Sequence, residues 1–288
     1  MHADLPVQPG ARALAVVQII DGQAAGATRW TPDEVAVALV HDAGTTAVMM
    51  ATPTDIEDLA IGFSLTEGII ESAAEIVRLE VVSTALGLEA RMWLAAARSA
   101  RLARRRRTLA GPTGCGLCGV DSLEAARRVL PRAANGLRLS AGDIQAALHA
   151  LSRAQDLGKT TRAAHAAGWW TPTTGLLMAR EDVGRHNALD KLAGALARAP
   201  GASAPGAVVL TSRVSIEMVQ KAAMIGAEAI VAISAPTALA VEAADQAGIT
   251  LVAIARDDGF MIFSHPQRLV DLARGQDGGA VTPVRSVR

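Results

Sequence analysis

The hydrophobic positions form a different pattern in each half of the chain. In the first hundred residues, short apolar runs are separated by turn-forming pairs such as Asp21-Gly22. This pattern predicts the strands of a hairpin-rich sheet. The runs are residues 13–20, 35–39, 46–50, 77–82 and 88–94. Thr54 and Glu57 have the spacing of a capping box and predict a helix through Leu65, so we expect a small α+β module here.

In the second half the apolar runs are short and continuous, and helical segments lie between them. Strands are expected at residues 208–210, 230–233 and 251–254, with helices at 216–225 and 238–247. This alternation predicts parallel strands covered on both faces by crossover helices. Further helices are expected at 121–131, 140–157 and 187–196. The predicted fold class is therefore α/β.

The length of 288 residues is enough for two domains. Five segments are expected: flexible tails at 1–12 and 276–288, a small α+β domain at 13–110, a cysteine loop with its following helix at 111–130, and an α/β domain at 131–275.

Composition excludes several classes of function. The 28 basic and 28 acidic side chains give a net charge of zero, which argues against a protein that coats nucleic acid or an anionic membrane. Aromatic residues make up only 2% of the chain, too few for base-stacking platforms. No apolar run approaches the roughly 18 residues of a membrane helix, and residues 1–12 do not resemble a signal peptide. With two cysteines and no disulfide framework, we expect a cytoplasmic protein that binds neither nucleic acid nor membrane.

The two cysteines lie in a glycine-rich loop with the sequence Gly-Cys-Gly-Leu-Cys-Gly, at Cys115 and Cys118. Five nearby arginines, Arg101 and residues 104–107, favour the thiolate, which is the better nucleophile. A half zinc site is an alternative, although two of the six histidines would have to complete it and none are paired in sequence. A thioredoxin-like redox pair is another, although its usual strand and helix context is absent. Zinc deaminase chemistry is excluded, because no His-x-Glu is present and no proline precedes Cys115.

A second segment, residues 181–191, gathers charged and polar side chains at the start of a predicted helix. Arg185, His186 and Asn187 would join the free backbone N–H groups there in an anion-binding cluster. Asp190 follows His186 by four residues, a spacing that lets the carboxylate orient the imidazole. Ordinary surface ion pairs are the alternative interpretation.

The ends of the three predicted parallel strands carry hydroxyls, arginines and tight turns. These ends are residues 211–215, 234–237 and 255–259. Because ligands bind outside the carboxyl ends of such strands, we expect a site for a phosphate-bearing ligand. Serine and threonine there can instead cap the following helices, and both roles are compatible. His165, alone among alanines, is either a buried hydrogen-bonded histidine or a ligand contact.

Together these motifs resemble the FdhD/NarQ family of formate dehydrogenase accessory sulfurtransferases. The resemblance rests on Cys-Gly-x-Cys-Gly, on Glu-Asp-Val-Gly-Arg-His-Asn-Ala-x-Asp-Lys, on Ser-Arg-Val-Ser-x-Glu-Met-Val and on Ser-Ala-Pro-Thr. It covers residues 13–269, and the second motif is highly specific. The resemblance implies a C-terminal domain like cytidine deaminase without its zinc, and a smaller N-terminal α+β domain.

The same resemblance implies a function. A cysteine desulfurase would load the protein with sulfur as a cysteine persulfide. The sulfur would then pass to the bis-molybdopterin guanine dinucleotide cofactor before that cofactor enters formate dehydrogenase. Family members are typically homodimers and hold no metal of their own, and a guanine nucleotide should mimic the cofactor. A non-catalytic chaperone for the molybdenum cofactor is the alternative.

Residue roles follow by position in the family motifs. Cys115 matches the persulfide carrier, and Cys118 matches a cysteine that relays or resolves the sulfur. The nucleotide part of the cofactor is expected to contact Ile254, Ala255, Arg256, Asp257, Asp258 and Gly259. Residues that line the same pocket are expected to be Arg185, His186, Asn187, Ser212, Arg213 and Thr237.

The chain departs from the family pattern at two places. The family's Thr-Gly-Gly-x-His is replaced by Thr161-Arg162-Ala163-Ala164-His165. Side chains at these glycine positions would obstruct a close backbone approach or a positive φ. Gly158 stands where a phenylalanine is usual. Both changes bear on one wall of the expected pocket, while the cysteine loop is intact.

Overall fold

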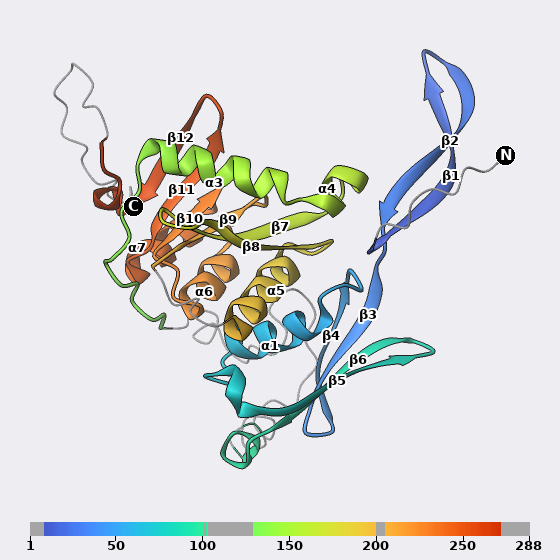
Figure 1. The fold of residues 1–288 in the computed structure, drawn as a ribbon, viewed down its shortest axis with the longest axis horizontal. Coiled ribbons are helices and arrows are strands. Elements are labelled where there is room, and N and C mark those ends of the chain that lie inside the picture. The colour runs from blue at the N-terminus through green and yellow to red at the C-terminus, as the bar shows by residue number, and fades with distance from the viewer. Residues whose placement is uncertain (1–8, 101, 103–128, 200–204, 272–288) are drawn as a thin grey trace.

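The computed structural model describes residues 9–100, 102, 129–199 and 205–271 (Figure 1). Both cysteines, nearly all of the helix predicted at 121–131 and most of the two predicted tails lie outside these residues. The described chain combines helices with a six-stranded, a four-stranded and a two-stranded sheet. This confirms the α/β class in its general sense.

Besides a helical segment at residues 96–100, the described N-terminal part contains six strands and one α-helix. They are β1 (Ala11–Ile20), β2 (Gln23–Pro32), β3 (Val35–His41), β4 (Gly44–Ala51), α1 (Ile56–Thr66), β5 (Ile76–Thr84) and β6 (Gly87–Leu94), with a short 3-10 helix η1 (Ala73–Glu75) before β5. The four-stranded sheet has the order β4-β3-β6-β5, and one of its faces packs on α1. All five predicted strands are confirmed. Strand β2 was not predicted, because its Ala- and Gly-rich sequence has no apolar run.

The predicted capping box at the start of α1 is wrong. The residue before the helix is Asp55, in the left-handed conformation with φ 52°, and its side chain makes no capping hydrogen bond. Glu57 instead forms an ion pair with Arg198 of the second half, at 3.0 Å. The Glu57 carboxylate, which the sequence pattern predicted to cap α1, therefore takes part in a contact between the two halves.

The C-terminal part contains the six-stranded sheet and five helices longer than one turn among the described residues. They are α3 (Ala141–Arg153), α4 (Asp156–Thr161), β7 (His165–Thr171), β8 (Gly175–Asp182), α5 (Arg185–Arg198), β9 (Ala207–Leu210), α6 (Ile216–Met224), β10 (Ala229–Ala232), α7 (Ala238–Ala247), β11 (Thr250–Arg256) and β12 (Gly259–Ser264), with η2 (Pro266–Arg268) at the end. The strand order is β12-β11-β10-β9-β7-β8. Strands β9, β10 and β11 are parallel, as predicted. Antiparallel strands that the pattern did not reveal, β7 and β8 at one side and β12 at the other, extend the sheet.

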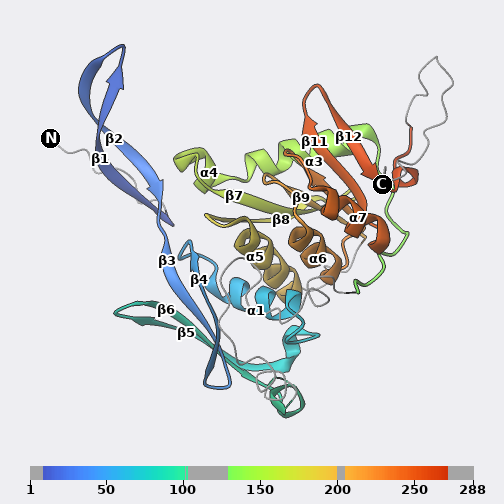
Figure 2. The ribbon, with the colours of Figure 1, turned by 180° about the vertical axis from the view of Figure 1, so that it is seen from behind.

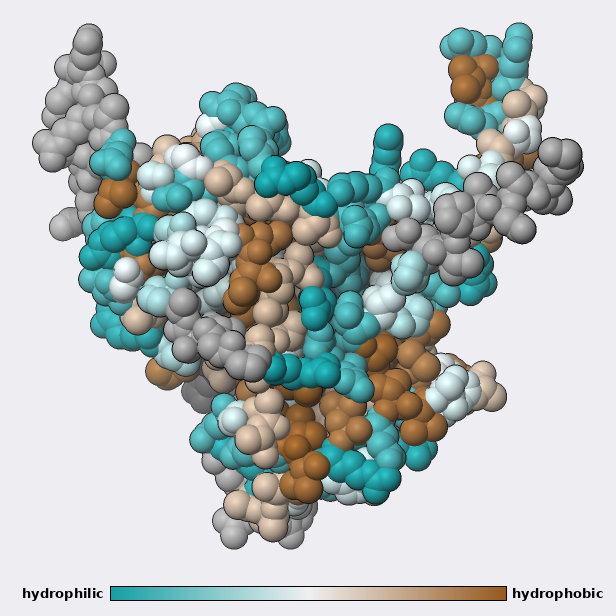
Figure 3. Space-filling view, in the orientation of Figure 1, coloured by the Kyte–Doolittle hydropathy of each residue, from teal (hydrophilic) through white to brown (hydrophobic). Residues whose placement is uncertain are grey.

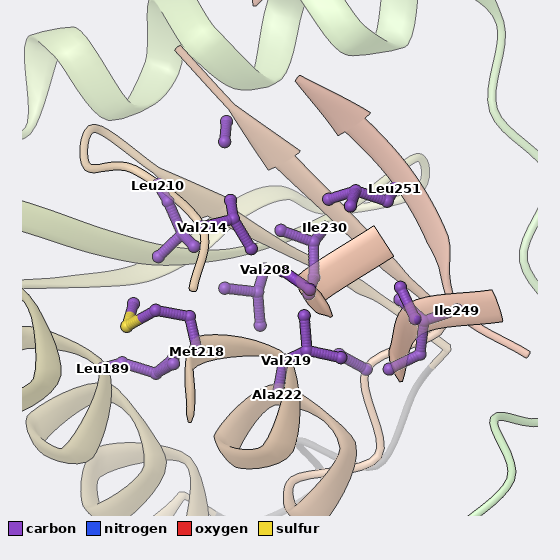
Figure 4. Packing of buried hydrophobic residues seen from close by; sticks show 14 of the residues in the cluster. Leu189, Val208, Leu210, Val214, Met218, Val219, Ala222, Ile230, Ile249 and Leu251 are labelled. Carbon is purple, nitrogen blue, oxygen red and sulfur yellow. The ribbon is translucent and has the colours of Figure 1, made fainter. Parts of the chain in front are cut away.

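The two crossover helices lie on one face of this sheet, so the prediction that crossovers cover both faces is wrong. Strands β9, β10 and β11 succeed one another in one direction, and right-handed crossovers then place α6 and α7 on the same side. Helix α5 joins them there, and α3 covers the opposite face (Figures 1 and 2). Alternate strand residues pack into the two cores. Val208 and Leu210 face α5 and α6 (Figure 4), whereas Val209 belongs to the core on the α3 side.

The helix predicted at 140–157 is divided into α3 and α4. Ser140 and Asp143 form a capping box that begins α3, and this helix ends at Arg153. The carboxylate of Glu181 then accepts hydrogen bonds from the backbone N–H groups of Leu157 and Gly158, both at 2.8 Å. Glu181, which is distant in sequence, thus starts α4 within a segment whose sequence pattern predicted one continuous helix.

The N-terminal and C-terminal parts meet where α1 crosses α5. A Cβ on Gly62 would overlap the carbonyl oxygen of Asp190, and a Cβ on Gly194 would overlap that of Asp58. The two backbones therefore approach as closely as glycine allows. Asp58 closes the contact through hydrogen-bonded ion pairs with Arg180 and Arg198, at 2.8 and 2.9 Å.

Replacing Gly62 by alanine should destabilise the protein by at least about 2 kcal/mol, because the added methyl group forces two packed helices apart. Gly142 of α3 is the matched control: a Cβ there meets only the Ser140 hydroxyl, at an ordinary 3.6 Å. Gly142→Ala should stabilise the helix by up to about 1 kcal/mol. Chemical unfolding of the full chain measures both, and equal effects would contradict the assigned contact.

Candidate functional site

The carboxyl ends of the parallel strands meet at one edge of the six-stranded sheet, as predicted. The loops that follow them are joined by main-chain hydrogen bonds, from Val214 N to Ala235 O at 3.2 Å and from Ile254 N to Ser234 O at 3.2 Å. Strand β7 runs antiparallel to β9, so His165 at its start lies at the same edge. Three steps between neighbouring strands separate β7 from β11, a span of about 14 Å.

Ile254 is the most unusual backbone position at this edge. It has a φ of 52°, which is rare for a β-branched residue. The register of β11 against β12 shifts between Ala253 and Arg256, so Ile254 lies in a bulge. Ala253 packs with the α5–α7 core, whereas Ala255 packs with the α3 core. Residues two apart in a regular strand have their side chains on the same face of the sheet. The bulge therefore moves the side chains that follow Ile254 to the opposite face, at the point where the expected nucleotide contacts begin.

The residues expected to contact the nucleotide differ in their accessibility. Arg256, Asp257, Asp258 and Gly259 are exposed, Ile254 is half-buried and Ala255 is buried. Helix α3 holds this turn from the side: Gln145 donates to the Arg256 carbonyl at 2.7 Å, and His149 pairs with Asp257 at 3.0 Å. The sequence did not indicate these two α3 residues.

Two hydroxyls at the other strand ends make local hydrogen bonds. Ser212 is buried and donates to the carbonyl of Arg213 at 3.1 Å. Thr237 caps α7 by accepting a hydrogen bond from Ala240 N at 3.2 Å, which confirms the capping role considered for it. The Arg213 side chain is exposed at this edge.

Much of the segment 181–191 is a buried network that holds the two halves together. Lys191 and Asp182 form an ion pair at 2.7 Å, and both side chains are fully buried. Asp182 also accepts a hydrogen bond from Thr52 N at 3.0 Å, and Lys191 donates to Thr52 O at 3.0 Å. Asn187 donates to the Asp182 carboxylate at 3.0 Å and to the carbonyl of Met50 at 2.8 Å. The Asn187 amide therefore joins the end of β4 to the start of α5.

The predicted interaction between Asp190 and His186 is wrong. Asp190 is buried and binds Lys221 of α6 at 2.9 and 3.0 Å and Thr66 of α1 at 2.6 Å. Lys221 has only 9% of its side chain exposed and also pairs with Glu67. A buried carboxylate requires a cation more than a neutral imidazole, and Lys221 supplies it.

His186 lies beside this network at the start of α5. Burial, together with the positive charges of Arg185 and Lys221, lowers the pKa of His186 to about 4. The imidazole is therefore neutral at pH 7. Its Nε2 atom and the Nε atom of Arg185 are buried and have no hydrogen-bond partner in the part of the chain that the structure describes. Two polar atoms without partners mark this helix start as different from the fully paired network beneath it.

His165 is half-buried at the neighbouring start of β7. Burial and the positive charge of Arg185 lower the pKa of this imidazole. Arg185 thus lies close enough to two histidines to disfavour protonation of both. The structure brings His165, Arg185 and His186 together at the edge that the strand ends define.

Among the described residues, no group of three or more His, Cys, Asp or Glu side chains is placed to hold a metal ion. Both cysteines lie outside these residues, so the cysteine loop itself stays a prediction. No helix in the described part of the chain is long and apolar enough to cross a membrane.

Comparison with known proteins assigns the family. A model of the FdhD/NarQ family matches residues 32–270. The chain belongs to the FdhD/NarQ family. A relative from Agrobacterium fabrum named sulfur carrier protein FdhD is 49% identical over 92% of this chain and 98% of its own length. A relative of the same name from Xanthomonas campestris is 45% identical over 92% of this chain and 94% of its own length.

The fold agrees with a solved structure as well. A crystal structure of a candidate formate dehydrogenase accessory protein from Desulfotalea psychrophila has a TM-score of 0.70 and 25% identity. The match covers 91% of this chain and 100% of that chain. The likeness therefore extends over both halves of this FdhD/NarQ protein.

One departure from the family pattern has a clear structural consequence. Arg162 ends α4 in the left-handed conformation with φ 56°, so a side chain does stand at a position with the positive φ that favours glycine. The cost is roughly 1–2 kcal/mol. At the other departure, a Cβ on Gly158 would lie 3.1 Å from both Gln155 and Glu181. A larger residue there would displace the Glu181 carboxylate that starts α4.

The neutral state of His186 predicts how stability depends on pH. The unfolded imidazole binds a proton below about pH 6.5 and the folded one only below about pH 4, so stability is lost as the pH falls between these values. The shift corresponds to roughly 3 kcal/mol, which solvent screening at a part-exposed ring reduces to about 2 kcal/mol.

Urea unfolding of the full chain at pH 7 and pH 4 measures this loss. We expect it to be about 2 kcal/mol smaller in His186→Gln than in the wild type. Parallel pH dependence in the two proteins would show that the folded imidazole titrates normally.

Proposed function

We propose that this protein is a sulfur carrier that matures formate dehydrogenase. The observation that carries the proposal is the intact Cys-Gly-x-Cys-Gly loop in a chain of this family. Relatives that match over nearly their whole length are named sulfur carrier protein FdhD. The proposed client is the bis-molybdopterin guanine dinucleotide cofactor, and the acting species is a homodimer in the cytoplasm.

Loading requires only an exchange between sulfur atoms. The Cys115 thiolate attacks the outer sulfur of a persulfide on the cysteine desulfurase, and the donor cysteine leaves as a thiolate. A new S–S bond replaces the old one, so no external oxidant or reductant is needed. The arginines at residues 104–107 favour the attacking thiolate.

Cys118 has two possible roles in this scheme. As a relay, it receives the outer sulfur from Cys115 by the same exchange. As a resolving residue, it attacks the Cys115 sulfur, which forms a Cys115–Cys118 disulfide and releases hydrosulfide. A cellular thiol then has to reduce the disulfide before the next cycle.

The sheet edge supports binding of a large anionic client. Arg185, Arg213 and Arg256 lie at strand ends or helix starts along about 14 Å of this edge. Guanidinium groups bind phosphates through two parallel hydrogen bonds. We propose that the nucleotide end of the cofactor binds at residues 254–259, with Ser212, Arg213 and Thr237 beside it. In this proposal the domain is a deaminase-like fold that has kept a nucleotide site without metal chemistry.

The non-catalytic chaperone stays an alternative for one reason. The side chains at the described edge are suited to hydrogen bonding and charge pairing, and no cysteine lies among the described residues. Such an edge would serve a carrier and a chaperone equally well. Sulfur loading therefore separates the two.

Cys115→Ala should abolish sulfur loading by a cysteine desulfurase supplied with cysteine. Mass spectrometry of the wild type should show the added mass of one sulfur atom on the peptide that contains Cys115. Cys118→Ala is the matched control, because it removes the other thiol of the same loop and should still be loaded at Cys115. A Cys115→Ala protein that still gains sulfur and activates formate dehydrogenase would refute the assignment.

Guanosine diphosphate should bind the wild type, and Arg213→Ala should weaken binding about tenfold, or ~1.4 kcal/mol. Arg138 is the control, because it is also an exposed arginine but lies away from the proposed site. The preceding residue, Leu137, donates its backbone N–H to Glu228, which lies at the opposite end of β10 from the site. Arg138→Ala should leave the affinity unchanged in calorimetric titration. Equal affinity in all three proteins would exclude Arg213 from the site.

A further inference from the structure

The hairpin of β1 and β2 projects from the molecule as a separate arm, residues 11–32 (Figures 1 and 2). Its strands are paired along their whole length, from Ala11 opposite Pro32 to Ile20 opposite Gln23. Asp21 and Gly22 form the tip with φ values of 49° and 77°, which suit the tight turn of a regular hairpin. The arm is thus a well-formed element that no other described helix or strand covers.

Both faces of the arm are apolar and exposed. Leu14, Val16 and Ile20 lie on one face, with exposed fractions of 43%, 37% and 59%. Val17 and Ile19 lie on the other, at 72% and 62%. A two-stranded hairpin alone in water is at best marginally stable. A surface that covers these apolar side chains would stabilise the arm.

The base of the arm is anchored, so the arm cannot simply fold back on its own body. Arg29 donates to the carbonyl of Thr161 at the end of α4, at 3.1 Å. Arg12 pairs with Asp33 at 2.9 Å, and Asp33 N donates to Gly10 O at 2.7 Å. The space-filling view shows the arm clear of the body, with apolar side chains near its tip (Figure 3).

The charges of the arm restrict its partner. Between Arg12 and Arg29 the only charged residue is Asp21 at the tip. A strongly acidic or basic partner would therefore find no complementary charges, whereas an apolar, uncharged surface is complementary. A second copy of the chain supplies that surface through its own arm, and a twofold axis makes each contact twice.

The area of the arm is also sufficient. A two-stranded ribbon of ten residues is about 33 Å long and 10 Å wide, so each face offers about 330 Å². If one face of each arm packs on the partner's arm and the other on the partner's body, the total buried area is roughly 2,000 Å², at the lower end of the range of obligate homodimers. Contact through one face of each arm alone would bury roughly 700 Å², which is too little.

We propose that the arm joins two copies of this protein, with one face against the partner's arm and the other against the partner's body. This deepens the proposed homodimer by naming its surface. It requires no step of sulfur transfer, so either proposal can fail without the other.

Sedimentation velocity of the full chain tests the arm. The wild type should be a dimer at micromolar concentration, and Ile19→Lys should raise the dimer dissociation constant about a hundredfold, because a charge without a partner would be buried. Met261 on β12 is the matched control, because it is also an exposed apolar strand residue, at 56%. Strand β12 lies on the opposite side of the molecule from the arm (Figure 2). Met261→Lys should stay dimeric.

Circular dichroism establishes that both variants are folded, which is expected because the substituted side chains are exposed. A monomeric wild type would overturn the proposal, and so would an Ile19→Lys protein as dimeric as the wild type. Equal dissociation of the two variants would also overturn it, since the effect would not be specific to the arm. A wild type that is monomeric alone and joins only a cysteine desulfurase would assign the arm to that partner instead.

Discussion

The buried ion pair of Lys191 and Asp182 is the constraint on which the rest of the structure depends. Both side chains are fully buried, so each charge must be compensated within the protein. Asp182 achieves this by accepting hydrogen bonds from Thr52 N, Gly184 N and the Asn187 amide in addition to Lys191. One carboxylate therefore fixes the end of β8, the start of α5 and the chain that follows β4.

A second buried network repeats this arrangement one helix further along. Lys221 of α6 binds Asp190 of α5, and Thr66 at the end of α1 donates to the same carboxylate. The two networks flank the start of α5, where His186 and Arg185 keep buried polar atoms without partners in the described chain. Burial is the main cause of the low pKa of His186, and the charges of Arg185 and Lys221 add to it. Lys221 therefore joins the two halves and also helps to keep this imidazole neutral.

Local patterns predicted what local interactions determine. Continuous apolar runs located β9, β10 and β11, and their parallel order then placed three strand ends at one edge. Strands β2, β7 and β8 are rich in alanine and glycine or mix polar with apolar residues, so pairing in the folded sheet defines them and no run in the sequence does. The partners of Asp190 and Glu57 come from distant helices, and each overrode a spacing rule that considers only neighbours. Lys191 lies within residues 187–195 of α5, all of which are buried, so its charge needed a partner inside the fold.

The charge distribution sets how an anionic client can reach the proposed site. The net charge is zero, so the protein has no long-range field that would draw the client in. At physiological ionic strength the attraction of Arg213 and Arg256 extends only about 8 Å. Each buried lysine is neutralised by its own carboxylate and adds little outside the fold. Capture of a phosphate-bearing cofactor from dilute solution would therefore be slow, and direct transfer from a bound partner protein is the arrangement that this electrostatic balance favours.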